Sequence, residues 1–128
     1  MNDTFKNILF KGKRKDNEKW VKGDLIHRKI WKREIPIIRT SDDGFESYEE
    51  YDVIPETVSR CSGLPDKDRQ LIFEGDIVEY NGEKHQVVFE TRNGAAYFGI
   101  VISPEETWKF CSEVPSDKMK IVGNVWDS

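Results

Sequence analysis

Apolar and polar residues alternate along the second half of the chain in a pattern that predicts an antiparallel β meander. Runs rich in Val, Ile, Phe and Tyr cover 76–80, 85–90 and 95–102, and such residues suit a pleated, half-buried surface. Asn-Gly pairs at 81–82 and 93–94 separate these runs. Asn-Gly is the strongest short hairpin signal, because a type I′ turn needs positive φ at both central residues. We therefore expect three consecutive strands joined by two tight turns.

The residues after this meander predict one short helical turn and a closing strand. In the run SPEETWKF, Ser103 is a candidate N-cap, Pro104 suits the first helical position and Glu106 the third, which is a capping-box pattern. The run 119–126 then favours a strand, and its glycine marks a place for a bulge or a close backbone approach. Four strands with a helical turn before the last one have the layout of a small SH3-like β-barrel.

The first half of the chain contains shorter strand candidates and one acidic stretch. Runs at 7–10 and 20–26 predict strands, and 35–38 predicts a third strand. Pro36 restricts this third strand to a sheet edge or to a strand start, because proline has no N–H for the ladder. The acidic, turn-rich stretch SDDGFESYEEYD at 41–52 predicts a linker or a mobile loop.

Together these elements predict a mainly β protein, with an α+β fold as the alternative. We expect an N-terminal β-rich basic subdomain at 1–58, which includes the acidic loop, and an SH3-like C-terminal subdomain at 59–128. A chain of 128 residues fits one domain or two fused subdomains. A chain of this size also buries enough surface to fold without a disulfide or a metal.

Composition excludes several classes of protein. The chain is 37% hydrophobic and 12% aromatic, which is too apolar for wholesale disorder. Its uninterrupted apolar runs are too short for a transmembrane helix, and we expect no signal peptide. Two cysteines, Cys61 and Cys111, are too few for a disulfide framework. We expect reduced thiols in a cytosolic protein, with one bridge between them as the alternative.

Charge is distributed unevenly along a chain whose formal net charge is −4. Residues 1–40 contain twelve Lys and Arg against five Asp and Glu, a balance of +7. Residues 41–128 contain eight against nineteen, a balance of −11. This split indicates an acidic partner for the first part, a basic partner for the second, or mutual neutralisation of the two parts.

The basic and aromatic stretch 11–33 is the first candidate for a binding surface. Its candidate contact residues are Lys11, Lys13, Arg14, Lys15, Trp20 and Trp31. Cations beside aromatic rings are the groups with which proteins bind a phosphate backbone and stack on bases. The same pattern is typical of a solvated hairpin tip or of a protein-facing patch, and the acidic chain as a whole argues against nucleic acid as the main partner.

The second candidate is the carboxylate pair Glu74 and Asp76, which flanks Gly75. Residues i and i+2 share one face of a strand, so this pair suits a cation site or an acid–base couple. In the structural alternative, which we favour, Gly75 supplies an unusual backbone angle and Asp76 accepts hydrogen bonds from nearby amides. With Asp66, these are the carboxylates that an enzyme hypothesis would test.

The remaining motif searches point to no chemistry. His27 and His85 have no histidine at i+4 and no cysteine cluster beside them, which a zinc site would require. The sequence contains no GxSxG and no glycine-rich phosphate loop. We therefore expect a protein that is not an enzyme and that uses neither cofactor nor metal.

Several segments together resemble the YopX protein family of phages and prophages of Gram-positive bacteria. The similar segments are FKGKRKDNEKWVKGDLI at 10–26, VIPETV at 53–58, SGLPDKDRQLIFEGDIV at 62–78 and IVGNVW at 121–126. The sequence departs from the family pattern at Ser62, where Thr is usual, at Arg69, where Gly is common, and at Phe73, which replaces Tyr. These changes are mild for the fold.

The resemblance implies a small phage-encoded cytoplasmic protein that is mostly β, has an SH3-like C-terminal part and assembles into homo-oligomers. It implies no cofactor, no catalytic residue and no assigned activity. With the charge split, it leads us to expect a non-enzymatic oligomeric protein-interaction module in a bacterial host cell. Its expected partners are further copies of itself and a phage or host protein, with no membrane contact. Nucleic-acid binding through residues 11–33 is the alternative.

Overall fold

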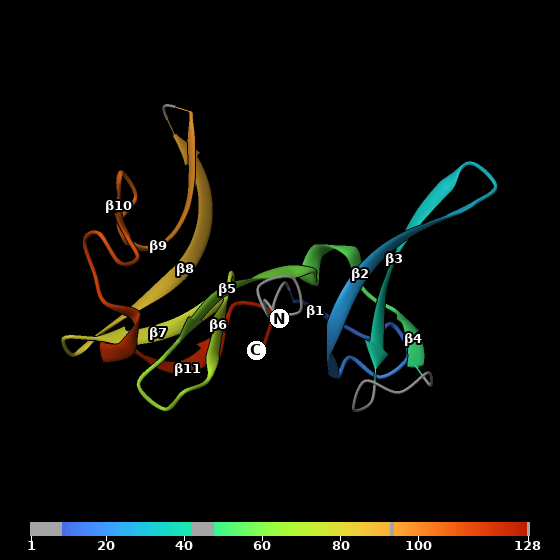
Figure 1. Ribbon diagram of the computed structural model, residues 1–128, viewed down its shortest axis with the longest axis horizontal. Helices are drawn as coiled ribbons and strands as arrows, with labels where there is room; N and C mark the ends of the chain where they lie inside the picture. Colours follow the sequence, from blue (N-terminus) through green and yellow to red (C-terminus); the bar gives the residue numbers. More distant parts are fainter. Residues whose placement is uncertain (1–8, 42–47, 93, 128) are drawn as a thin grey trace, which may run out of the picture. The chain divides into compact units, whose positions relative to one another are not determined.

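The computed structural model describes residues 9–41, 48–92 and 94–127, and this part of the chain is mainly β, as predicted (Figure 1). The chain divides into two compact units, Met1–Cys61 and Ser62–Ser128, whereas the sequence placed the boundary after residue 58. No helix among the described residues is long and apolar enough to cross a membrane.

The first unit is an antiparallel sheet with a small core. Its elements are β1 (Phe10–Lys13), β2 (Trp20–Ile30), β3 (Arg33–Ser41), β4 (Tyr48–Asp52), the 3₁₀ turn η2 (Pro55–Thr57) and the start of β5 (Ser59–Pro65). The strands pair in the order β4-β3-β2-β1-β5. Ile37, Ile38 and Val53 are its buried apolar residues. Thr57 fixes η2 to β1, because its Oγ1 accepts the Lys13 N–H at 2.9 Å.

The strand β4 corrects the prediction of a loop at 41–52. It pairs with β3 from Ile37↔Asp52 to Ser41↔Tyr48, so at least residues 48–52 are part of the sheet. The negative charge of this segment obscured the strand, although its tyrosines suit a sheet. Residues 42–47 lie outside the described part of the chain.

Pro36 lies within β3, between β2 and β4, and not on an edge strand. Its carbonyl accepts a hydrogen bond from the Val53 N–H at 3.3 Å. The N–H and C=O of one strand residue point to the same side, so the N–H that proline lacks would also face this side. The β3–β4 ladder has already ended at Ile37, and therefore Pro36 removes no ladder bond.

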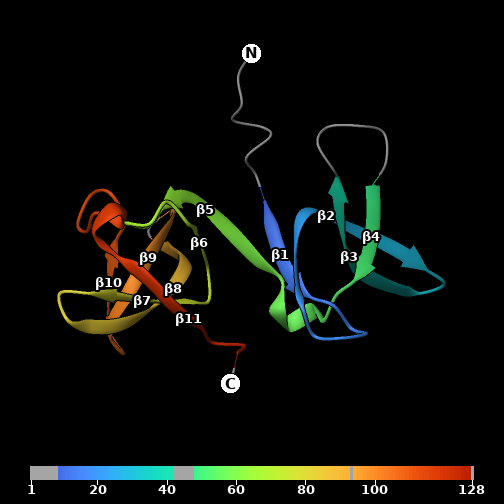
Figure 2. The same ribbon diagram turned by 90° about the horizontal axis from the view of Figure 1, so that it is seen from below.

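The second unit contains the predicted meander. Its further elements are β6 (Leu71–Phe73), β7 (Asp76–Tyr80), β8 (Glu83–Arg92), β9 (Ala95–Ser103), β10 (Glu106–Lys109), the 3₁₀ turn η3 (Ser116–Lys118) and β11 (Lys120–Asn124). The five-stranded sheet has the order β10-β9-β8-β7-β11, and β11 runs alongside β7 (Figure 2). Asn81 and Gly82 have φ of 53° and 81°, as a type I′ turn requires.

This sheet curves around a core but does not close into a barrel, so the SH3-like description fits only loosely. The buried core residues are Ile72, Val78, Val87, Ile100, Phe110, Val114 and Met119. Strands β10 and β11 remain as the two edges of the sheet. The pairing of β11 with β7 shifts register between Ile121 and Gly123, which confirms the bulge expected at this glycine.

The predicted helical turn at 103–110 is wrong. Residues 104–105 form the turn of a hairpin, and β10 follows, with Trp108 packed against the core. Proline at the second position and a polar residue before it suit a β-turn as well as a helix start, and burial of Trp108 decides between them. The helical turn before the last strand is instead η3.

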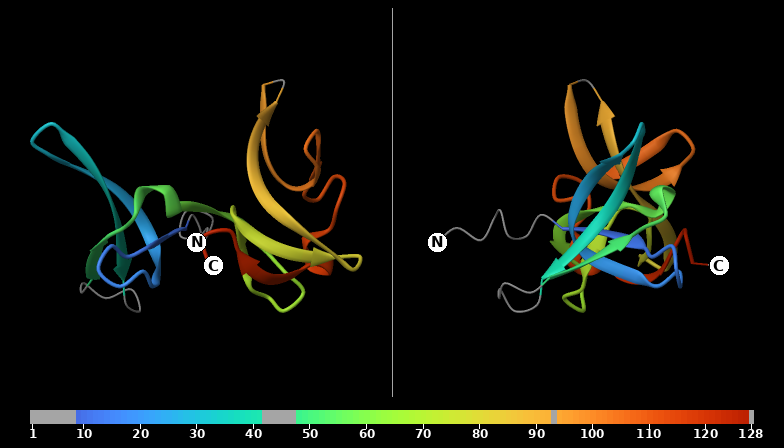
Figure 3. Two further views of the ribbon diagram at one scale, coloured as in Figure 1. Left: turned by 180° about the vertical axis from the view of Figure 1, so that it is seen from behind. Right: turned by 90° about the vertical axis from the view of Figure 1, so that its right-hand side faces the viewer.

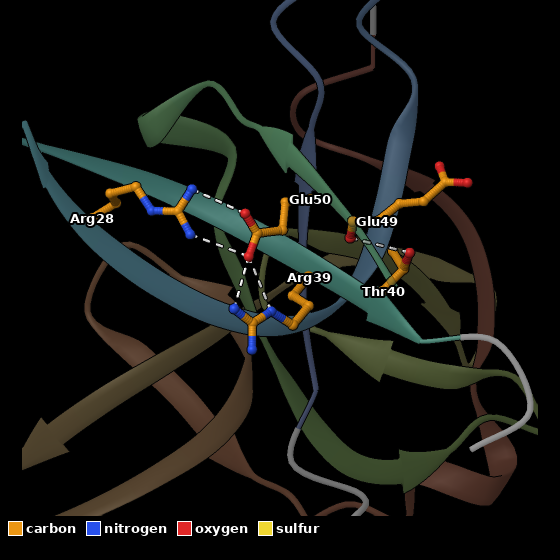
Figure 4. A network of polar contacts seen from close by, with 5 residues as sticks. All are labelled: Arg28, Arg39, Thr40, Glu49 and Glu50. Atoms are coloured by element: carbon orange, nitrogen blue, oxygen red, sulfur yellow. Dashed lines mark hydrogen bonds and ion pairs between the residues drawn. The ribbon is translucent and has the colours of Figure 1, made fainter. Parts of the chain in front are cut away.

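The acidic stretch folds back onto the basic stretch within the first unit. Glu50 on β4 lies between Arg28 on β2 and Arg39 on β3 (Figure 4). Its Oε1 is 2.9 Å from Arg28 Nη1, and its Oε2 is 2.7 Å from Arg39 Nη2. Counted over whole units, the first unit contains thirteen Lys and Arg against twelve Asp and Glu, and the second contains seven Lys and Arg against twelve Asp and Glu. Much of the charge split is neutralised inside one unit.

These ion pairs make the first unit sensitive to acid. Hydrogen bonds from Arg28 and then from Arg39 hold the pKa of Glu50 below its ordinary value of 4.5. A carboxyl whose pKa is lower in the folded state stabilises the fold above its unfolded pKa, and this contribution is lost as pH falls through the folded pKa.

Glu50→Gln is therefore expected to lower the urea midpoint at neutral pH, and the gap to the parent protein should close as pH falls through the lowered pKa of Glu50. Circular dichroism during urea unfolding at several pH values measures both. Glu56→Gln, an exposed change in the same unit, is the control and should leave the midpoint almost unchanged. A gap that is equal at all pH values would contradict the role of this carboxylate.

Candidate interaction surface

The structure brings three of the six predicted contact residues together on β1 and β2. Lys13 is directly opposite Trp20 in the register, and Lys11 is opposite Lys22. The Nζ atoms of Lys11 and Lys13 lie 4.6 Å and 5.4 Å from the centre of the Trp20 ring, within cation–π range. Lys11 is only 9% exposed, so this cluster is partly built into the sheet.

Arg14 is engaged within the fold. Its Nε and Nη2 donate to the two carboxylate oxygens of Asp16 at 2.9 Å and 2.6 Å, and its guanidinium lies 4.2 Å from the centre of the Tyr51 ring. The hydrogen bond to Asp16 raises the pKa of Arg14, and the same bond lowers the pKa of Asp16. This Arg14 cation is already matched by a carboxylate.

Lys15 lies beside Arg14 at a shallow pocket of about 390 Å³, which is also lined by Asp16, Glu50, Tyr51 and Asp52. Three carboxylates line this pocket with two cations. The mixture does not favour a polyanion such as nucleic acid, which requires a surplus of positive charge.

Trp31 lies apart from the other five residues, at the end of a two-stranded arm. Strand β1 pairs with β2 only as far as Gly23, and β4 pairs with β3 only from Ile37. Residues 24–26 still pair with the part of β3 that carries β4. Among the described residues, 27–36 therefore form a hairpin without a third strand, which we call the arm. It extends away from the rest of the first unit (Figure 3).

The turn of the arm places an aromatic residue where glycine is favoured. Trp31 and Lys32 form the turn, and Trp31 has φ of +59°. Two-residue hairpin turns need positive φ at this position, which Gly, Asn and Asp adopt most easily. For other residues such a conformation costs about 1–3 kcal/mol. Trp31 is also 90% exposed, so no packing within the described fold offsets this strain.

Cations and a second apolar side chain surround Trp31. Ile30 is 47% exposed, and Lys29, Lys32 and Arg33 are exposed as well. We call residues 29–33 the arm tip. Trp and Arg are enriched in protein interfaces, and Trp is a frequent hot spot. This hairpin was not predicted from the sequence, because its turn lacks the usual Asn or Gly.

Of the predicted carboxylate pair at 74 and 76, Asp76 is engaged by hydrogen bonds within the fold. Asp76 is 2% exposed; its Oδ2 accepts the Phe73 N–H at 2.8 Å and its Oδ1 accepts the Asn124 Nδ2–H at 2.9 Å. Gly75 has φ of +87°, and its carbonyl accepts the Val125 N–H at 2.8 Å. These contacts agree with the structural alternative, because they fasten β11 to the turn between β6 and β7.

Asp66, the third carboxylate that the sequence suggested, has the same kind of role. It is 3% exposed, and its Oδ1 accepts the N–H groups of Asp68 and Gln70, both at 2.9 Å. Its Oδ2 accepts the Ile121 N–H of β11 at 3.0 Å. Within the described chain, no three His, Cys, Asp or Glu residues are grouped so that they could hold a metal ion.

The histidines and cysteines are dispersed. His27 is exposed on the arm, whereas His85 is buried with its Nδ1 3.0 Å from the Val101 carbonyl oxygen. Cys61 and Cys111 are not joined by a disulfide. These residues therefore do not combine into a nucleophilic or metal-binding arrangement with one another.

Comparison with known proteins identifies the family. A family model described as YopX protein matches residues 9–128, nearly the whole chain. No curated protein matches the chain. The segments that carried the resemblance include both sides of the Asp66 and Asp76 hydrogen bonds, so the likeness rests on residues that build the fold. The chain belongs to the YopX protein family.

Proposed function

We propose that this protein is a non-enzymatic, oligomeric protein-interaction module that acts in the cytoplasm of a phage-infected or lysogenic bacterial cell. The observation that carries the proposal is Trp31, a bulky aromatic residue that is 90% exposed and strained in its turn. Residues in sparsely populated conformations concentrate at functional sites. An exposed Trp beside cations is a typical anchor of a protein interface.

Charge supports contacts between copies of the chain. The second unit has a balance of −5, from seven Lys and Arg against twelve Asp and Glu, whereas three cations lie at the arm tip. Opposite charges at an interface raise the association rate and select the partner. Two of the three carboxylates that an enzyme hypothesis would test, Asp66 and Asp76, are engaged by backbone and side-chain donors of the fold.

This proposal predicts an assembly that weakens as salt rises. Light scattering after size exclusion, at micromolar protein, should give a mass above one copy at about 50 mM NaCl and a lower mass at about 500 mM, where charges are screened over a few ångströms. A mass of one copy under both conditions would contradict oligomerisation.

Nucleic-acid binding is the second candidate, and the cluster of Lys11 and Lys13 over Trp20 favours it. If this surface binds nucleic acid, labelled oligonucleotides, single- or double-stranded, should gain fluorescence anisotropy at about 50 mM salt and lose it as salt rises. Lys13→Glu with Lys15→Glu should abolish the gain, whereas Lys118→Glu with Lys120→Glu in the second unit should not. Flat anisotropy with the parent protein would remove this candidate.

A further inference from the structure

We propose that the arm tip of one copy docks on an apolar patch at the end of β11 of a second copy. This inference rests on the proposed function and names the two surfaces that the assembly would use. We assign Val122, Val125 and Trp126 to this patch because they lie close together in sequence at the end of β11 and are 42%, 41% and 43% exposed.

Both surfaces combine exposed apolar side chains. Of the six large apolar residues that are exposed in the described chain, two belong to the arm tip and three to the patch. The two exposed apolar residues of the arm tip are Ile30 and Trp31. Burial of one aromatic side chain typically removes about 150–250 Å² of surface from water. Contact between the arm tip and the patch would therefore remove apolar side chains of both surfaces from water.

The charges beside the two surfaces are opposite. At the arm tip, Lys29, Lys32 and Arg33 flank Ile30 and Trp31 in the sequence. Beside the patch, three carboxylates that are not buried adjoin β11 in sequence or register: Glu74, Glu79 and Asp127. Glu74 precedes Gly75, whose carbonyl accepts the Val125 N–H, Glu79 pairs with Lys120 in the register, and Asp127 follows Trp126. Two cations, Lys118 and Lys120, lie just before and at the start of β11, so the carboxylates near the patch outnumber the cations.

The backbone of the patch is held in place by hydrogen bonds. The Val125 N–H is fixed to the Gly75 carbonyl at 2.8 Å, and the Trp126 N–H donates to Asn124 Oδ1 at 2.9 Å. Asn124 is itself held by the buried Asp76. The backbone that presents Val125 and Trp126 is therefore preorganised, which lowers the entropic cost of binding.

The arm tip and the patch lie on different units, so the contact is head-to-tail. Each copy offers one arm tip and one patch, and such a heterologous contact forms a ring if the rotation closes. A single tip is small beside the 1,200–2,000 Å² that a stable interface usually buries. Assembly should therefore depend strongly on concentration.

Trp31→Gly separates binding from folding. Glycine adopts positive φ without strain, so thermal unfolding should occur at the same or a higher temperature than in the parent protein. Assembly measured by light scattering should nevertheless need at least about tenfold more protein, as expected for loss of an aromatic hot spot. Val122→Glu should weaken assembly from the other side, and Leu71→Ser, at an exposed apolar residue outside the patch, is the control that should not.

Mixing the two defective variants tests the direction of the contact. The intact arm of Val122→Glu should dock on the intact patch of Trp31→Gly, so the mixture should contain a species of two copies that neither variant forms alone at that concentration. Absence of this species would overturn the head-to-tail pairing.

The remaining outcomes separate the two proposals. A parent protein that stays at the mass of one copy overturns both the assembly and its interface. A Trp31→Gly variant that assembles like the parent overturns only the role of the arm. Assembly lost in Trp31→Gly but kept in Val122→Glu overturns the assignment of the patch.

Discussion

The buried carboxylate of Asp76 is the interaction on which the second unit depends. It joins three strands, since it begins β7, accepts the Phe73 N–H at the end of β6 and accepts Nδ2–H of Asn124 on β11. An unsatisfied buried donor costs about 1–3 kcal/mol, so each partner requires this carboxylate. Asp66 makes a similar contact, because its buried carboxylate accepts a hydrogen bond from the Ile121 N–H of β11. The last strand is thus fastened to the sheet at two points by side chains distant in sequence.

This arrangement explains why the segments that resemble the YopX protein family are also segments that build the fold. The segment 62–78 contains both buried aspartates, and 121–126 contains the groups that donate to them. In the first unit, the VIPETV segment contributes Thr57, which caps the backbone of β1. The side chains of these residues make hydrogen bonds that hold the strands together. The exposed arm lies outside those contacts.

Local signals predicted the meander well, because Asn-Gly turns and alternating runs determine hairpins through neighbouring residues. The same local logic failed at 103–110, where packing of Trp108 selected a strand over a helical turn. Local signals also missed β4. Its acidic sequence suggested a loop, because the cations that neutralise Glu50 lie on other strands, β2 and β3. Trp31 was recognised as one member of a basic stretch, but its position at the end of an unsupported arm depends on where β1 and β4 stop pairing.

A double-mutant cycle on Asp76 and Asn124 tests most directly whether the carboxylate acts as a structural tie. Asp76→Ala, Asn124→Ala and the double variant would be compared with the parent protein by urea unfolding. Contacting residues show interaction energies of about 0.5–3 kcal/mol, and we expect a coupling in the upper part of this range because the hydrogen bond is buried and charge-assisted. Two single effects that simply add would contradict the account.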